Sequence, residues 1–108
     1  MPQQAPDVFQ VIADPSRREM LKLLSRETMT INSLAQNFEM SRPAVSKHLK
    51  VLHGAGFISI RNSGRERYCE LRQEGFKELQ QWIDYFDKFW VSRLKTLETL
   101  LKNREPKS

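Results

Sequence analysis

The sequence has a single cysteine, Cys69, among its 108 residues. One cysteine cannot form a disulfide within the chain or supply a Cys-rich zinc cluster, so the composition favours a reducing compartment, the cytoplasm. Long apolar runs are missing too, because no uninterrupted stretch approaches the ~20 residues that span a bilayer. The N-terminal MPQQAPD lacks the basic region and apolar run of a secretory signal. These absences disfavour secretion and membrane insertion.

The residue groupings typical of enzymes are also missing. We find no nucleophile beside a base, no glycine-rich phosphate loop and no paired acids at useful spacing. A chain of 108 residues, 39% of them hydrophobic, fits one compact domain with a modest core and excludes a large multidomain enzyme. We therefore expect a binding protein rather than an enzyme.

Acidic side chains are in deficit, and the deficit is local. Eighteen Lys and Arg oppose thirteen Asp and Glu, for a formal charge of +5. Residues 41–72 carry seven basic and two acidic side chains together with both histidines, whereas residues 1–40 and 73–108 are mixed in sign. Such a patch favours a polyanionic partner, and nucleic acid is the first candidate.

Capping residues and apolar spacing predict a mainly α chain with one hairpin. Asp14 before Pro15, and likewise Thr30 and Ser41, are typical helix N-caps. Period-two alternation around Asn62, Ser63 and Gly64 predicts a pair of strands. The expected elements are helices at about 6–13, 15–25, 31–38 and 41–55, strands at 58–61 and 65–71, and a long helix at 73–103. This α-α-α-α-β-β-α order describes one domain, residues 1–108, with a frayed tail at 104–108.

The third and fourth expected helices, joined by a turn of about four residues and followed by a basic hairpin, have the order of a winged helix-turn-helix. At 100° per residue, Val45, Leu49 and Leu52 fall on one side of the fourth helix and would anchor it. The other side would enter the major groove, where Arg42 and Lys47 can donate to guanine. The candidate DNA contacts on this helix are Ser41, Arg42, Pro43, Ser46, Lys47 and Lys50.

The hairpin adds three arginines beside a glycine-containing tip. Arg61, Arg65 and Arg67 could grip the DNA backbone or enter a narrow minor groove, and Arg65 is the expected tip contact. The alternative is that they only solubilise a strand edge. The coincidence of a short helix pair, a polar outward helix face and a local charge of +5 favours DNA binding.

The chain contains the runs VIADPSRREMLKLL, LAQNFEMSRPAVSKHLKVLHGAGFI and RNSGRERYCEL. Over nearly its whole length, from about Val8 to Leu101, it resembles the ArsR-type (ArsR/SmtB) winged-helix repressors. The resemblance implies a homodimer that represses transcription from an operator with two-fold symmetry. It also implies DNA contacts at Arg42, Pro43, Ser46 and Lys47. Pro43 replaces the polar residue often found there, which leaves fewer donors for reading bases.

Many members of this family sense metals, but the ligands for a metal are missing from this chain. Thr30 stands where the metal-sensing members carry cysteine, and the second family site needs histidines on the last helix. The histidines here are His48 and His53, both on the fourth helix. Asp84 and Asp87 could offer oxygens but are typical of a solvated face. The resemblance is therefore to a branch without a regulatory metal, and we expect no metal or other cofactor.

Two further side chains have structural interpretations. His48 lies about 60° from the centre of the apolar stripe of its helix, which predicts a partly buried hydrogen-bonding group. Cys69 shares a hairpin face with Leu71, which predicts a small packed apolar group rather than a redox sensor.

The last expected helix is too long for the core of one small domain. At 1.5 Å per residue, about 31 residues extend ~46 Å. Its wide aromatic stripe predicts a self-pairing interface, while Phe76 and Leu79 can pack within one subunit. A membrane-surface helix is the alternative, but its acidic residues argue against that. The expected interface residues are Val8, Phe9, Ile12, Trp82, Ile83, Phe86, Phe89, Trp90, Leu94 and Leu97.

The sequence thus predicts a homodimeric repressor that binds double-stranded DNA at an inverted repeat. Residues 5–72 would hold the DNA-binding helices and wing, and residues 73–103 the dimerisation helix. The competing interpretation is a winged-helix interaction module whose basic face meets an acidic protein partner. Such a module would show no preference among duplexes.

Overall fold

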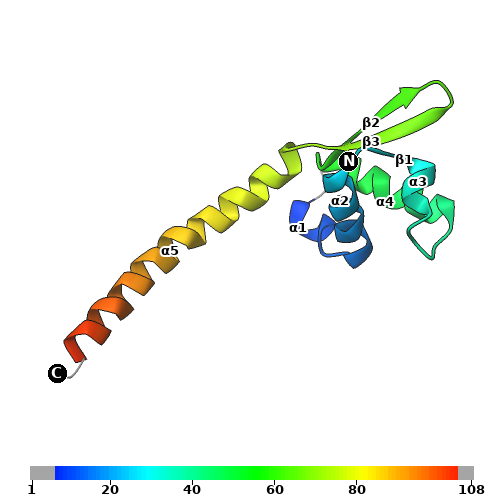
Figure 1. Ribbon diagram of the computed structural model, residues 1–108. Helices are drawn as coiled ribbons and strands as arrows, with labels where there is room; N and C mark the ends of the chain where they lie inside the picture. Colours follow the sequence, from blue (N-terminus) through cyan, green and yellow to red (C-terminus); the bar gives the residue numbers. More distant parts are fainter. Residues whose placement is uncertain (1–6, 105–108) are drawn as a thin grey trace.

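The computed structural model describes residues 7–104 and has a compact body with one long projecting helix (Figure 1). The elements, in chain order, are α1 (Val8–Val11), α2 (Pro15–Arg26), β1 (Met29–Thr30), α3 (Ile31–Ala35), α4 (Arg42–Gly54), β2 (Ile58–Ser63), β3 (Glu66–Leu71) and α5 (Glu74–Arg104). We call residues 7–71 the body. The predicted mainly helical winged fold is confirmed, with one strand more than expected.

The helices of the body begin at the predicted capping residues. The Asp14 carboxylate accepts hydrogen bonds from the backbone N–H groups of Ser16 at 2.8 Å and Arg17 at 3.2 Å. The hydroxyls of Thr30 and Ser41 likewise accept from backbone N–H groups in the first turns of α3 and α4. These bonds satisfy donors that a helix start leaves free, so each cap fixes where its helix begins.

The sheet is antiparallel with the strand order β1-β3-β2. The predicted hairpin is confirmed, with Ile58 opposite Leu71 and Ile60 opposite Cys69. The strand β1 was not predicted. It has two residues, too few to show alternation, and it exists because the chain after α2 runs beside β3 and pairs Thr30 with Tyr68.

Two helices end two or more residues before the predicted position. α1 ends at Val11 rather than Ala13, and α3 ends at Ala35 rather than Phe38. Beyond α3 the chain continues as a tight turn in which the Phe38 N–H donates to the Ala35 carbonyl at 3.1 Å. Phe38 still packs against the core. Its spacing from the apolar residues of α3 therefore indicated a buried side chain but not a longer helix. Pro6 and residues 105–108 lie outside the described residues.

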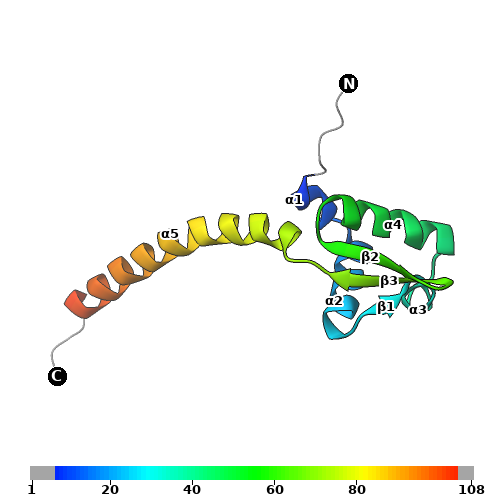
Figure 2. The same cartoon turned by 90° about the horizontal axis from the view of Figure 1, so that it is seen from above.

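The core of the body lies between the helices and the sheet. Its largest fully buried side chains are Phe57, Met20, Leu34, Leu49, Leu52 and Ile58. The sheet and α4 lie beside each other (Figure 2). The wing formed by β2 and β3 reaches beyond the helices of the body (Figure 1).

Two glycines, Gly56 and Gly75, allow the first turn of α5, which we call its root, to lie against the core. Gly56 has a φ of +83°, and its carbonyl accepts the Gly75 N–H at 2.8 Å. A Cβ on Gly75 would lie 2.7 Å from the Phe57 ring, so only glycine lets α5 begin so close to the core. Phe76 adds an edge-on contact with Phe57 at 4.9 Å between ring centroids. Trp82 makes a further contact with Phe9 of α1, and beyond it α5 leaves the body (Figure 1).

Candidate DNA interface

The two faces of α4 have the predicted environments. Val45, Leu49 and Leu52 are at most 1% exposed and hold the helix against the core. The predicted DNA-facing residues Ser41, Arg42, Pro43, Lys47 and Lys50 are exposed, and Ser46 is partly exposed. The apolar face fixes the orientation of α4, and the opposite face presents cations and a hydroxyl to a ligand.

The wing separates the three predicted arginines. Arg61 pairs across the strands with Tyr68, lies 5.2 Å over its ring and forms an ion pair with Glu70 at 3.4 Å. Arg67 alternates with Tyr68 along β3 and therefore points to the other face, the one that Cys69 shares. Arg65 is exposed beside Gly64 at the tip, where φ is +63°. Hence Arg65 and Arg67 are directed differently from Arg61, whose charge is partly neutralised.

A polar depression joins the wing to the helix-turn-helix. It has a volume of about 190 Å³, and it brings together Arg42 of α4 and the wing residues Arg65 and Arg67. The rest of its wall comprises Thr30, Ile31, Asn32 and Glu66. Three arginines and one glutamate thus line one concave site, which gives it an excess of positive charge that can attract anionic oxygens. Asn32 was not among the predicted site residues. It lies in the first turn of α3, after the N-cap Thr30, and this position at a helix start was the sequence signal that could have indicated it.

Two arginines of α2, Arg17 and Arg18, tie this helix to the end of α1, and Arg17 also reaches His48 of α4. The Arg17 Nε donates to the Val11 carbonyl at 2.7 Å, and its guanidinium lies 3.3 Å from His48 Nδ1. Arg18 donates to the carbonyls of Ile12 and Ala13. His48 is partly buried, which confirms the interpretation of this residue as a hydrogen-bonding group on the support side of α4.

Cys69 is fully buried, which confirms the packed apolar role. Burial raises the pKa of its thiol to about 11. The thiol is therefore protonated near neutral pH and a poor nucleophile. Among residues 7–104, no three side chains of His, Cys, Asp and Glu gather as a metal site would require.

The predicted interface residues divide between the body and α5. Val8 is 7% exposed and belongs to the core, so it offers little surface to a partner. Phe9 is 36% exposed and its ring meets Trp82 edge-on at 5.4 Å. Ile12 is partly buried. The predicted residues on α5 are all exposed: Trp82, Ile83, Phe86, Phe89, Trp90, Leu94 and Leu97.

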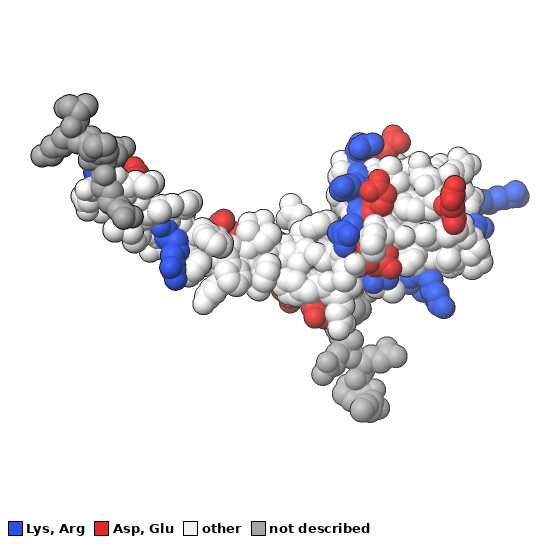
Figure 3. Space-filling view, turned by 90° about the horizontal axis from the view of Figure 1, so that it is seen from below, with Lys and Arg blue, Asp and Glu red and all other residues white. Residues whose placement is uncertain are grey.

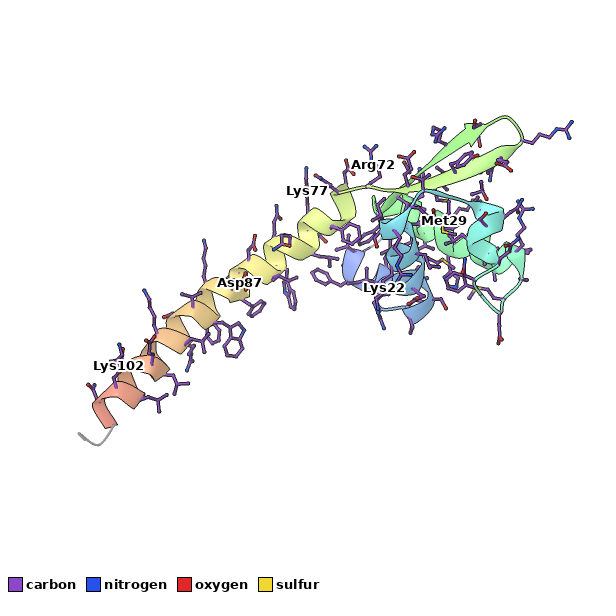
Figure 4. All side chains as sticks on the ribbon, in the orientation of Figure 1. Lys22, Met29, Arg72, Lys77, Asp87 and Lys102 are labelled. Carbon is purple, nitrogen blue, oxygen red and sulfur yellow. The ribbon has the colours of Figure 1, made fainter. Side chains whose placement is uncertain are left out.

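The charged and apolar surfaces occupy different regions. In Figure 4, Lys77 and Lys102 rise from one side of α5 and aromatic rings lie on the other. The face seen in Figure 3 is mostly uncharged along α5, whereas basic and acidic side chains are interspersed over the body. No helix of the described residues is both long and apolar enough to cross a membrane.

A helix-turn-helix whose second helix exposes basic side chains, followed by a basic hairpin, defines a winged-helix DNA-binding protein. The model of the bacterial regulatory proteins of the arsR family matches residues 14–59. Transcriptional repressor SdpR of Bacillus subtilis is 35% identical over 77 residues, covering 71% of this chain and 86% of SdpR. The HTH-type transcriptional regulator Rv2034 of Mycobacterium tuberculosis is 35% identical over 92 residues, covering 84% and 83% of the two chains.

Solved structures agree with this relationship. A crystal structure described as a possible transcriptional regulator for arsenical resistance is 39% identical with a TM-score of 0.69, covering 87% of this chain and 95% of that one. The chain belongs to the arsR family. It is a DNA-binding transcriptional regulator and not an enzyme.

Proposed function

We propose that the protein is a homodimeric repressor that occludes a promoter by binding an inverted repeat in the cytoplasm. Residues 5–72 bind DNA and residues 73–103 form the dimer, so that two-fold symmetry sets two copies of α4 in successive major grooves, ~34–36 Å apart. The protein needs no metal for this activity. The observation that carries the DNA-binding role is the convergence of Arg42, Arg65 and Arg67 on one depression beside the exposed face of α4.

The proposed contacts have distinct roles. Lys47 projects from the middle of the exposed face of α4, where it can donate to a base edge. Arg65 and Arg67 hold phosphates from the wing, while Arg42 does so from the first turn of α4. Arg61 does not take part in phosphate binding, because it forms an ion pair with Glu70 on the other face of the wing.

The dimer rests on the surface of α5. The radius of gyration is 20.5 Å, against roughly 13 Å for a compact chain of this length. An isolated helix that exposes so many large apolar side chains is unfavourable in water, and a second copy of the same surface covers it most simply. Light scattering should therefore report a dimer at micromolar concentration, and a monomer would refute this part.

Operator binding tests the proposed contacts. Selection of bound genomic fragments supplies the operator, and fluorescence anisotropy against that duplex and a scrambled one measures specificity. Lys47→Ala should cost about 1–3 kcal/mol for the operator and relax selectivity. Arg67→Ala should weaken binding to both duplexes and lower the salt slope by about 1.

Arg61→Ala is the matched control on the same wing. It removes the same charge from the opposite face, so its effect should be clearly smaller than that of Arg67→Ala. Equal effects of the two variants would contradict the division of the wing into a DNA face and an outer face. A metal titration that changes operator affinity several-fold would contradict metal-free action.

A further inference from the structure

Arg17 lies in the first turn of α2 and contacts two other helices. Its Nε donates to the Val11 carbonyl at 2.7 Å and its Nη2 to the Gln10 carbonyl at 3.3 Å, both at the end of α1. Its Nη1 lies 3.3 Å from Nδ1 of His48 on α4. Only 18% of this long side chain is exposed. One guanidinium group therefore joins α1, α2 and α4, and each of its three nitrogens has a separate acceptor.

The contact between Arg17 and His48 has a defined direction. A guanidinium group can only donate hydrogen bonds, so Nδ1 of the ring is the acceptor and the ring N–H is on Nε2. Arg17 is held in place for this contact, because its backbone N–H donates to the Asp14 carboxylate at 3.2 Å and that carboxylate lies 3.9 Å from Nη1. The carbonyls of α1 hold the other side of the guanidinium group. Arg17 therefore presents an oriented donor to α4.

His48 is placed to set the rotation of α4 about its own axis. Val45, Leu49 and Leu52 attach this helix to the core, but apolar contact is less directional than a hydrogen bond. His48 is the sequence neighbour of Lys47, the proposed base contact. A rotation of about 10° would move a side-chain end about 6 Å from the helix axis by roughly 1 Å. A displacement of that size is enough to weaken hydrogen bonds to base edges.

The neighbouring arginine, Arg18, lacks the contact with α4. Its Nη1 donates to the carbonyls of Ile12 and Ala13 at 2.7 and 3.1 Å, just after α1. Within residues 7–104, its side chain hydrogen-bonds only to this segment, and it is exposed. The two arginines therefore share the same charge, the same helix and the same kind of acceptor near α1. They differ in the bond of Arg17 to His48.

We propose that Arg17 is a positioning residue for DNA recognition. It holds His48 and so fixes the rotation of α4 that brings Lys47 to a base edge, with the end of α1 as its support on the other side. This support extends to the long helix, because Phe9 of α1 meets Trp82 of α5 edge-on at 5.4 Å. The inference rests on the operator binding proposed above, and it adds a residue outside the proposed DNA contacts that determines selectivity.

Two matched variants of the full chain test the role of Arg17. Arg17→Met and Arg18→Met each remove one positive charge from α2, keep an apolar stem and free carbonyls near the end of α1. Fluorescence anisotropy gives the operator preference, the ratio of the dissociation constants for the scrambled duplex and the operator. Arg17→Met should lower this preference about tenfold. Arg18→Met should leave it within about twofold. Equal preferences of the two variants would overturn the positioning role.

Variants of His48 keep the test decisive if Arg17→Met fails to fold. His48→Leu removes the acceptor but keeps a side chain of similar size, so it should lower the operator preference about fivefold or more. His48→Asn places an amide oxygen near the position of Nδ1 and should restore most of the preference. Urea unfolding of the same variants measures stability separately. If the preference stayed unchanged while stability fell, His48 and Arg17 would have only a structural role.

A double-mutant cycle separates positioning from direct contact of His48 with DNA. In the Arg17→Met background, His48→Leu should cause no further loss of operator preference, because the bond that it breaks is already absent. Additive losses would overturn the proposal. The native protein distinguishes this inference from the proposed function. If it shows no preference for the operator, both fail, whereas a native preference that Arg17→Met retains in full overturns the positioning role alone.

Discussion

The body and α5 have similar apolar residue types but opposite environments. In the body, Phe57, Met20 and Leu52 are completely buried by side chains of the same chain. On α5, Trp90 is 57% exposed and Leu94 is 61% exposed. Burial of apolar side chains within the chain therefore stabilises the body, whereas the apolar face of α5 is exposed in a single copy and is covered in the dimer that we propose. The same residue types form the core of one region and the exposed surface of the other.

We expect the largest difference between the two regions when one aromatic side chain of each is truncated to alanine and the free energy of unfolding is compared. Phe57→Ala should lower the free energy of unfolding by about 3–5 kcal/mol, because it leaves a cavity under the root of α5. Trp90→Ala should change the stability of the monomer little and weaken the dimer. Urea unfolding at several protein concentrations separates the two effects. A large loss of monomer stability from Trp90→Ala would contradict the contrast.

The junction between the regions offers the next largest effect. Gly75→Ala places a Cβ 2.7 Å from the Phe57 ring, so the ring or the start of α5 must shift. We expect a loss of about 1–3 kcal/mol in urea unfolding. Gly64→Ala is the control in open space, where only the positive φ of +63° opposes the substitution. A neutral Gly75→Ala would mean that α5 is not held by this contact.

A smaller effect concerns the N-cap of α2 and depends on pH. Burial raises the pKa of Asp14, but the N–H groups of Arg17 and Ser16 outweigh it and bring the pKa below the usual 3.8. The ionised carboxylate therefore adds stability above pH 3.8 that is lost as the pH falls through the lower folded pKa. Asp14→Ala should cost about 0.5–2 kcal/mol at pH 7.

The pH profile provides the check on Asp14. The difference in unfolding free energy between the native protein and Asp14→Ala should narrow below pH 3.8. Asp14→Asn keeps an oxygen acceptor without the charge, so it should recover most of the loss at pH 7. A difference that stays constant down to pH 2 would refute the assigned role of the charge.

The smallest expected effect concerns the chemical reactivity of the Cys69 thiol. Because burial raises the pKa of this thiol to about 11, iodoacetamide should react slowly with the native protein at pH 8. The reaction should accelerate once urea exposes the thiol. Fast alkylation of the native protein, followed by mass spectrometry, would show that the β3 face of the body opens readily.

Local signals in the sequence predicted much of the fold. The N-caps Asp14, Thr30 and Ser41 bond to backbone N–H groups two or three residues further along the chain, so they can be predicted without knowledge of tertiary contacts. The split of α4 into a Val45 face and a Lys47 face follows from helix geometry alone. The strand β1 was missed because a two-residue strand has no period and depends on a distant partner.

The candidate DNA site was predicted as a set of residues and not as an arrangement. The sequence predicted Arg61, Arg65 and Arg67 together as DNA contacts, because all three lie on one basic hairpin. Strand register then put Arg61 on the face opposite to Arg67 and beside Glu70. Likewise, Val8 fits an apolar interface by residue type, yet it is buried in the core of its own chain.

The sequence alone therefore determined the helix starts, the apolar faces and the basic character of residues 41–72, because these depend on near neighbours and on fixed helical and strand periods. Tertiary structure alone decided which arginines meet around one depression, how close α5 starts to Phe57, and which apolar side chains remain exposed. Those outcomes depend on contacts between residues far apart in the chain, and no local period records them.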